Sequence, residues 1–203
     1  MTRKLLVATH NPGKVREYRE ILADLPLEVT YLDAEGITFE VEETGTTFAE
    51  NAILKAATYA RLSGLWTWAD DSGLEVDALG GAPGVYSSRY AGPGATDGDR
   101  YRKLLDALSG VPWDQRTARF RCTVALAAPD GETRTVDGAC EGIIAFGPAG
   151  SNGFGYDPVF YFPEQAATMA QLDPEVKNRI SHRGRAAQAA VGVLAEMLAG
   201  ELR

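Results

Sequence analysis

The chain has 203 residues, of which 45% are hydrophobic and 24% charged. These values are typical of a globular protein, and the length suits one domain spanning residues 1–203. The formal net charge of −8 argues against a nucleic-acid surface, which needs clustered lysine and arginine, and against binding to an anionic membrane.

The N-terminal sequence MTRKLLVATHNPGK has neither the long apolar segment nor the small-residue cleavage site of a signal peptide. No stretch approaches the roughly 18 apolar residues of a membrane-spanning helix. We therefore expect a cytoplasmic protein. With only two cysteines and two histidines in the chain, a structural zinc site is not expected, and the thiols should be reduced.

Strands and helices alternate at the start of the chain. Apolar runs indicate buried strands, and Asn or Thr before a 3.6-residue apolar repeat indicates a capped helix. The patterns predict a strand at 4–9, a helix from 11 to about 25, an extended or irregular stretch at 27–41, a helix from 47 to about 62, and a short strand at 66–69.

The second half contains long glycine-rich segments and a hairpin with period-two alternation. The patterns predict a loop at 80–94, a helix at 96–109, a strand at 118–126, a turn at 129–131, a second strand ending near 144, a loop at 147–156, and a last helix from about 183 to 198. Mixed elements with an antiparallel hairpin predict an α/β fold with a mixed sheet.

The turn from Thr9 to Lys14 joins the first strand to the first helix. A helix N-terminus offers backbone N–H groups and a positive dipole end, both of which favour phosphate. Lys14 in the first helical turn opposes that dipole, and a bound polyphosphate would relieve the conflict. The alternative is an ordinary capped helix with a solvated lysine. The segment lacks the Walker A pattern.

Asp70 and Asp71 follow the apolar run that ends at Ala69. Adjacent strand residues point to opposite faces, so one carboxylate can serve a site while the other is held structurally. Carboxylates suit a hard cation such as Mg²⁺. The alternative is a turn built from Asp, Ser and Gly. The acidic pair Glu42–Glu43 is a weaker candidate for a second metal carboxylate.

The segment from Gly153 to Pro158 presents an aromatic residue between two glycines, which is suited to stacking on a flat base. Lys177 and the run Ser181–Arg183 follow, and arginine supplies only hydrogen-bond donors, which can read a carbonyl. The alternative is a hydrophobic loop that packs its aromatic residues, together with a capped helix whose His and Arg face solvent.

Together these segments resemble one family closely, the inosine triphosphate pyrophosphatases, also called dITP/XTP diphosphatases. The resemblance covers nearly the whole chain and keeps the order and spacing of the blocks. The matching blocks are ATHNPGKVRE, EETGTTFAENAILKA, ADDSGLEVDALGGAPGVYSSRYAG, GSNGFGYDPVF and KNRISHRGRA. Two departures are visible: His10 replaces a smaller or amide residue, and Asn152 replaces a glycine.

The resemblance implies an elongated, two-lobed single domain with a central substrate cleft, a homodimer, and Mg²⁺-dependent hydrolysis of ITP, dITP and XTP to the monophosphate and pyrophosphate. It implies that Asp71 is the general base and a metal ligand, with Glu43 rather than Glu42 as the further metal ligand. The substrate contacts that it implies are Thr9, His10, Asn11, Pro12, Gly13 and Lys14 for the phosphates, Ser72 near the substrate, Phe154, Gly155, Tyr156 and Asp157 around the base and sugar, and Lys177, His182 and Arg183 at the base.

Two other functions fit the same residues. A phosphotransferase would bind nucleotide and Mg²⁺ but would need an acceptor other than water. A non-catalytic nucleotide sensor would need no general base, so the Asp70–Asp71 pair argues against it.

Overall fold

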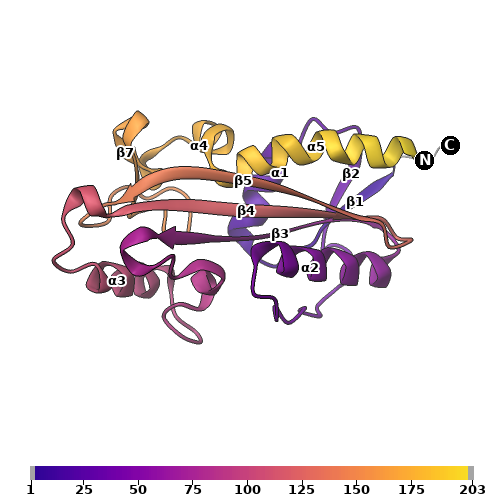
Figure 1. Ribbon diagram of the computed structural model, residues 1–203. Helices are drawn as coiled ribbons and strands as arrows, with labels where there is room; N and C mark the ends of the chain where they lie inside the picture. The colour runs from indigo at the N-terminus through magenta and orange to yellow at the C-terminus, as the bar shows by residue number, and fades with distance from the viewer. Residues whose placement is uncertain (1–2, 201–203) are drawn as a thin grey trace. The chain divides into compact units, whose positions relative to one another are not determined.

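The computed structural model describes residues 3–200 and contains one seven-stranded sheet with strand order β2-β1-β3-β4-β5-β6-β7 (Figure 1). Strand β1 pairs in parallel with β2 and β3, whereas β6 pairs antiparallel with β5 and β7. The predicted α/β class with a mixed sheet is therefore confirmed. The strands are β1 (Lys4–Val7), β2 (Glu28–Tyr31), β3 (Trp66–Val76), β4 (Thr117–Ala127), β5 (Thr133–Ile144), β6 (Phe160–Phe162) and β7 (Ala167–Thr168).

The chain divides into two compact units, each with its own core. The first unit comprises Met1–Asp71, Cys122–Gly138 and Arg183–Arg203, and the second comprises Ser72–Arg121 and Ala139–His182. Strands β3, β4 and β5 contribute residues to both units. The helices are α1 (Pro12–Ile21), α2 (Phe48–Ser63), α3 (Asp97–Ala107), α4 (Pro174–Ile180) and α5 (His182–Gly200).

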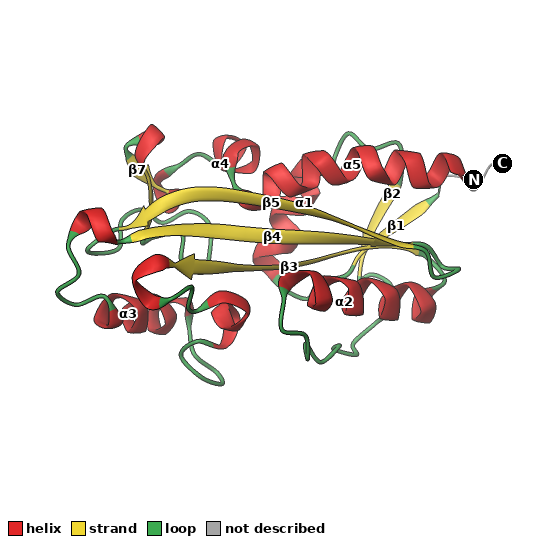
Figure 2. Cartoon of the chain, in the orientation of Figure 1, coloured by secondary structure: helices red, strands yellow, loops and turns green. Residues whose placement is uncertain are grey.

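The first unit has three layers, and the alternation of strand β1 produces them. Leu5 and Val7 pack with Tyr18 of α1 and with the alanines of α5, whereas Leu6 and Ala8 pack with the alanines of α2. Figure 2 shows α5 and α2 on opposite sides of the strands. Because successive strand residues point to opposite faces and both faces are covered, Leu5, Leu6 and Val7 are all buried, whereas Lys4 at the strand start is partly exposed.

The first two helices begin where their capping residues predict. The side chain of Asn11 caps α1, and Pro12 occupies its first turn. Thr47 forms a reciprocal capping box with Glu50 at the start of α2, and Gly64 ends that helix with a positive φ of 67°. Glycine adopts this left-handed backbone at little cost, which explains the stop. Helix α1 ends at Ile21, four residues earlier than predicted.

Strand β3 is longer than the sequence predicted. The apolar run 66–69 was expected to end at Asp70, but the strand continues to Val76. The carboxylates therefore lie within the strand and not after it. Continuation is possible because cationic side chains meet both carboxylates, as described below, so neither charge has to reach water.

The second unit is built around a separate apolar core. Leu74 and Val76 of β3 pack there with Leu104 of α3 and with Phe120 and Phe160. Arg116 is buried at its edge, where its guanidinium donates to the carbonyls of Leu108, Ile144 and Ala145. These bonds satisfy carbonyls that a loop would otherwise leave unpaired.

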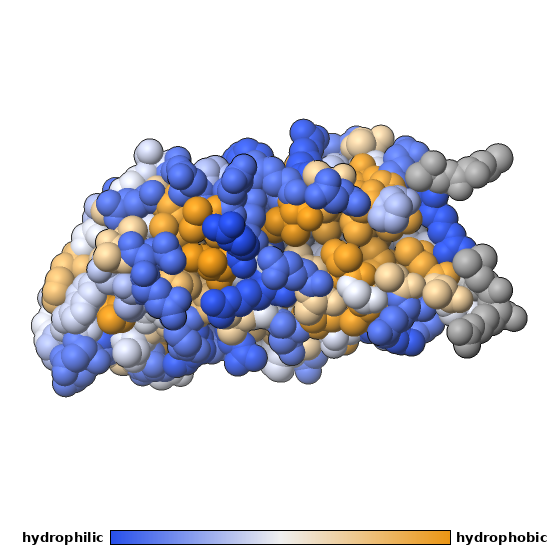
Figure 3. Space-filling model, turned by 90° about the horizontal axis from the view of Figure 1, so that it is seen from above, coloured by the Kyte–Doolittle hydropathy of each residue, from blue (hydrophilic) through white to orange (hydrophobic). Residues whose placement is uncertain are grey.

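The face in Figure 3 carries mainly hydrophilic side chains, with apolar areas between them. Large hydrophobic side chains that are exposed among the described residues include Phe39, Leu62, Tyr86 and Phe146. No helix within residues 3–200 combines the length and apolar character needed to cross a membrane.

Candidate functional site

Asp70 and Asp71 lie side by side in β3 and serve opposite faces of the first unit. Asp70 faces α1 and α5, where it contacts Lys14 and Arg183. Asp71 faces α2, where it contacts Asn51 and Lys55. The predicted division between the two carboxylates is thus present, and it follows from the two-residue period of a strand.

Asp71 is held by two residues of α2. Asn51 Nδ2 donates to Asp71 Oδ2 at 3.0 Å, and Lys55 Nζ lies 3.6 Å from Asp71 Oδ1. Burial raises the pKa of Asp71 above its usual value, against the opposing effects of Lys55 and Lys14. A carboxylate whose pKa is raised is a better proton acceptor, as a general base requires.

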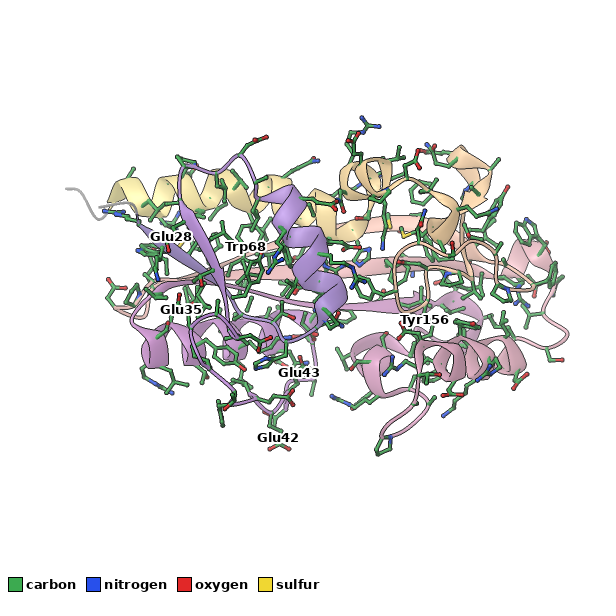
Figure 4. The ribbon with its side chains drawn as sticks, turned by 180° about the vertical axis from the view of Figure 1, so that it is seen from behind. Glu28, Glu35, Glu42, Glu43, Trp68 and Tyr156 are labelled. Carbon is green, nitrogen blue, oxygen red and sulfur yellow. The ribbon has the colours of Figure 1, made fainter. Side chains whose placement is uncertain are left out.

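Glu43, from the loop before α2, faces the same lysine. Lys55 Nζ donates to Glu43 Oε1 at 2.5 Å. Burial alone would lower the pKa of Lys55, but the carboxylates of Asp71 and Glu43 outweigh it and raise that pKa. Glu42 is exposed and points away from this group (Figure 4). The geometry therefore favours Glu43 over Glu42 as the partner of Asp71.

These two carboxylates have the chemistry that Mg²⁺ requires. Both contact the Lys55 ammonium, so their oxygens converge on a position that already accommodates a cation. Among residues 3–200, no three His, Cys, Asp or Glu side chains are arranged to hold a metal ion. Mg²⁺ usually takes one or two protein carboxylates and completes its shell with water and substrate phosphates, so Glu43 and Asp71 fit it.

Asp70 is the centre of a buried ion network on the opposite face. Its Oδ2 lies 3.0 Å from Lys14 Nζ and 3.4 Å from Arg183 Nε, and Arg183 Nη1 lies 2.6 Å from Glu17 Oε2. Burial alone would raise the pKa of Asp70, but Lys14 and Arg183 outweigh it and hold that pKa well below the usual range. Asp70 is therefore held in its ionised form by these two cationic side chains.

The turn between β1 and α1 has the predicted cap at Asn11. The N–H groups of Gly13 and Lys14 both donate to Asn11 Oδ1, at 2.8 and 3.2 Å. The capping side chain therefore occupies two of the N–H groups that the helix N-terminus would otherwise offer to phosphate. Asn11 N in turn donates to Thr9 Oγ1. Pro12 follows as the first residue of α1.

Lys14 is not the solvated lysine of the alternative reading. Its side chain is only 13% exposed, and its ammonium binds the carboxylate and the carbonyl of Asp70. The Asp70 carboxylate thus offsets the unfavourable position of Lys14 at the positive end of the helix dipole.

His10, also in this turn, has its Nδ1 3.1 Å from Asp33 Oδ1, and its Nε2 is buried without a hydrogen-bond partner.

Seven charged side chains form the ion-pair groups around Asp70 and Asp71. Four of them are carboxylates and three are cationic, and Lys14 is the cationic side chain that lies in the turn predicted to bind phosphate. These groups are Glu17, Glu43, Asp70, Asp71, Lys14, Lys55 and Arg183.

The second unit contains the predicted aromatic loop. Phe154 is half-buried, and Lys177 Nζ lies 5.0 Å from the centre of its ring. Lys177 also forms a buried ion pair with Asp157, whose Oδ2 accepts the Phe154 N–H at 2.8 Å. Asn152, one of the departures from the family pattern, donates to the carbonyl of Leu172 and so ties the loop to its surroundings.

The remaining predicted residues are distributed between the units. In the second unit, the buried Tyr156 donates to the Ser87 carbonyl at 2.8 Å, and Ser72 lies in β3. The His182 ring stacks on Phe120 at 4.6 Å, and its Nδ1 is 4.0 Å from Cys140 Sγ.

Arg183 belongs to the first unit, and its side chain is 2% exposed. The structure thus brings Lys14, Asp71, Glu43 and Arg183 together in one unit, and Phe154 to Asp157, Lys177 and His182 together in the other.

Sequence reasoning missed two residues of the Asp71 cluster, Asn51 and Lys55. Both lie on α2, four residues apart and therefore on one helix face. The signal was present, because this polar pair shares a face with the buried Ala52 and Ala56. A buried amide and ammonium next to alanines need polar partners, and the carboxylates supply them.

Comparison with known proteins gives a consistent result. The model of the Ham1 family matches residues 5–193. A dITP/XTP pyrophosphatase of Desulforamulus reducens is 53% identical over 192 residues, which cover 94% of this chain and 95% of that protein. The dITP/XTP pyrophosphatase of Bacillus subtilis is 50% identical, with 91% of this chain and 93% of that protein covered.

Solved structures agree with the sequence comparisons. A HAM1 protein from Coxiella burnetii superposes with a TM-score of 0.86 at 45% identity, covering 96% of this chain and 99% of that one. The Ham1 protein of Staphylococcus aureus gives a TM-score of 0.82 at 43% identity, covering 98% and 100%. The family model matches nearly the whole chain, and the relatives are similar over nearly their full length. The chain therefore belongs to the Ham1 family.

Proposed function

We propose that the protein hydrolyses non-standard purine nucleoside triphosphates, such as ITP, dITP and XTP, to the monophosphate and pyrophosphate. The observation that carries this proposal is the cluster of Asp71, Glu43 and Lys55, a buried carboxylate pair around a cation position. The relatives named dITP/XTP pyrophosphatase support the same substrate class.

Hydrolysis starts with a water molecule that Asp71 orients toward the α-phosphorus. Asp71 accepts a proton from that water as the new P–O bond forms, and burial raises the pKa of Asp71 toward what this step needs. The bond from the α-phosphorus to the bridging oxygen breaks, and pyrophosphate leaves. Asn51 keeps the carboxylate in position throughout, because its amide donates to Asp71 Oδ2.

The turn from Thr9 to Lys14 binds the phosphates in this proposal. Lys14 supplies the charge, since its ammonium can turn from the Asp70 carboxylate toward a phosphate oxygen. The capped N–H groups leave side chains as the main contacts of the turn, chiefly those of Thr9, His10 and Asn11. Positioning and electrostatics account for most of the expected rate acceleration.

Glu43 and Asp71 would hold Mg²⁺, which supplies charge neutralisation for the triphosphate when bound. Lys55 shares both carboxylates and must give up part of its contact for this to occur. The ammonium therefore competes with the metal for the same oxygens.

The aromatic loop binds the base in this proposal. Phe154 stacks on any purine and so supplies affinity without choice. We propose that Arg183 discriminates, because its donors meet the O6 acceptor of hypoxanthine or xanthine and clash with the amino group of adenine. The carboxylates of Glu17 and Asp70 already bind this guanidinium. To bind O6 of the base, Arg183 must either use an N–H group that neither carboxylate occupies or release one of the two carboxylates.

One assay separates the proposal from its rivals. Pyrophosphate and monophosphate are measured from ITP, dITP, XTP, GTP and ATP with Mg²⁺ and no other acceptor. Release of both products from the first three nucleotides is expected. A phosphotransferase would release neither product without an acceptor, and a nucleotide sensor would bind ITP without turnover. Equal hydrolysis of ATP and ITP would contradict the proposed selectivity.

We also propose a homodimer in the cytoplasm, where nucleotide pools are used. A short 3-10 helix before α3, Gly84–Arg89, exposes Tyr86, a residue that is 58% accessible, and the Arg89 guanidinium lies over its ring. Exposed aromatic and arginine side chains are enriched in protein interfaces. Light scattering at micromolar concentration should give twice the 21.8 kDa chain mass, and a monomer mass would contradict the dimer.

A further inference from the structure

The aromatic loop of the second unit is anchored at two consecutive peptide groups. The Phe154 N–H donates to Asp157 Oδ2, and the Gly155 N–H donates to Asp97 Oδ2, both at 2.8 Å. The first anchor belongs to the loop itself. The second comes from α3, 58 residues earlier in the chain.

These two bonds fix the direction in which the Cα–Cβ bond of Phe154 leaves the backbone. A peptide group is planar, so fixing its N–H fixes the orientation of the whole group. Asp157 fixes the plane before Phe154 and Asp97 fixes the plane after it, which together define both backbone angles of that residue. Gly153 and Gly155 flank Phe154 with positive φ values of 75° and 64°, a backbone conformation that glycine adopts at little cost, and the two hydrogen bonds hold the peptide groups in this conformation.

Asp97 is itself oriented by α3. It is the first residue of the helix, where a carboxylate interacts favourably with the dipole, and its Oδ1 accepts from Arg100 Nη1 at 2.5 Å. One oxygen therefore binds the helix and the other binds the loop. The Asp97 carboxylate thus links α3 to the aromatic loop, two segments of the second unit that are far apart in the sequence.

We propose that Asp97 is a positioning residue for base binding, acting through the backbone of Gly155 on the ring of Phe154. This inference rests on the proposed function, because it takes Phe154 as the surface on which the purine stacks. Asp97 does not contact the reacting phosphates in this proposal. Its loss should weaken ligands that carry a base and spare ligands that do not.

The same helix turn offers a matched control in Asp99. Asp97 and Asp99 each pair with an arginine three residues later, in both cases at 2.5 Å. Asp99 uses its other oxygen for the capping box with Thr96 and not for the aromatic loop. Asp99→Ala removes an acidic side chain, an ion pair and the bonds that Thr96 donates to the Asp99 carboxylate, so it perturbs the same helix turn as Asp97→Ala does.

The experiment compares the two variants with wild type in steady-state hydrolysis of ITP and in inhibition by the products. For Asp97→Ala we expect the KM for ITP and the inhibition constant of IMP to rise by about tenfold, the effect of losing one hydrogen bond to a charged group. The kcat should stay within about twofold and the inhibition constant of pyrophosphate should not change. Asp97→Asn, which keeps an acceptor oxygen, should recover part of the IMP affinity.

Asp99→Ala should leave all these constants at their wild-type values. An equal rise in the IMP constant for both variants would overturn the proposal, since helix stability would then explain it. Unchanged IMP affinity in Asp97→Ala would also overturn it. A parallel loss of pyrophosphate affinity would point to a general structural defect and would likewise overturn it.

Hydrogen–deuterium exchange provides a test that does not depend on activity. Exchange in a peptide covering residues 153–157 should be faster in Asp97→Ala than in Asp99→Ala or wild type, and equal exchange would overturn the inference. If wild type failed to hydrolyse ITP while exchange changed as expected, the proposed function would be wrong and the anchoring role of Asp97 would stand.

Discussion

Replacing Arg183 with methionine should destabilise the protein strongly. The guanidinium is 2% exposed and binds Glu17 and Asp70, so its removal leaves two buried carboxylates short of a cation. Breaking a buried ion pair in this way typically costs about 3–5 kcal/mol. For a chain of this length, each kcal/mol lowers Tm by roughly 2–4 °C, so the expected drop is about 6–20 °C.

Differential scanning calorimetry or thermal circular dichroism measures this change. Arg185→Met is the matched control, because Arg185 lies on the same helix and is exposed. Adding Glu17→Gln to Arg183→Met should restore part of the loss, since the uncompensated carboxylate is then removed. A melting temperature for Arg183→Met within about 2 °C of wild type would refute the reasoning. Selectivity of any Arg183 variant must accordingly be measured well below its melting transition.

Three further predictions concern the carboxylates and the metal. Asp71→Asn should lower kcat at least about a hundredfold, because an amide cannot act as the base, with little change in melting; retention of a tenth of the activity would contradict the role. EDTA should abolish pyrophosphate release and Mg²⁺ should restore it. Replacing Cys122 or Cys140 with serine should leave this Mg²⁺ requirement intact. Activity in EDTA, or loss of the metal requirement in either serine variant, would count against the carboxylate site. Hydrogen bonds from Thr96 lower the pKa of Asp99 to about 2 in the folded protein. The unfolded-state pKa of an aspartate is about 3.9, so the stability that the Asp99 charge adds is fully present above this pKa. That stability is lost as the pH falls toward 2. The difference in melting between wild type and Asp99→Asn should therefore shrink between pH 5 and about pH 2; a difference independent of pH would contradict this assignment.

Much of the fold could be predicted because local signals agree with the tertiary structure. The capping residues Asn11 and Thr47 both start helices, and the hairpin of β4 and β5 follows its alternation. The short elements β6, β7 and α4 were not predicted. They have two to seven residues, too few for a periodic pattern. Phe160 and Phe162 of β6 and Ile180 of α4 pack in the second core, and β7 pairs with β6.

The candidate site was predictable in its residue types and less so in its partners. Asp71 and Glu43 were expected to act together, and they do converge on one ammonium. That ammonium belongs to Lys55, which was not expected, because sequence spacing does not reveal which helix faces which strand. The length of β3 was misjudged for the same reason. Two adjacent aspartates predict the end of a buried strand, and the sequence does not show that cationic side chains such as Lys14 lie beside them.

The position of Lys55 has a consequence for how this protein folds. Two carboxylates brought together in a partly buried site repel each other in the folded protein, and many metalloproteins depend on their metal to overcome such repulsion. Here the polypeptide carries its own counter-ion, an ammonium 2.5 Å from Glu43 and 3.6 Å from Asp71. We therefore expect the chain to fold without added Mg²⁺, since the Lys55 ammonium already balances part of the carboxylate charge at the proposed metal position.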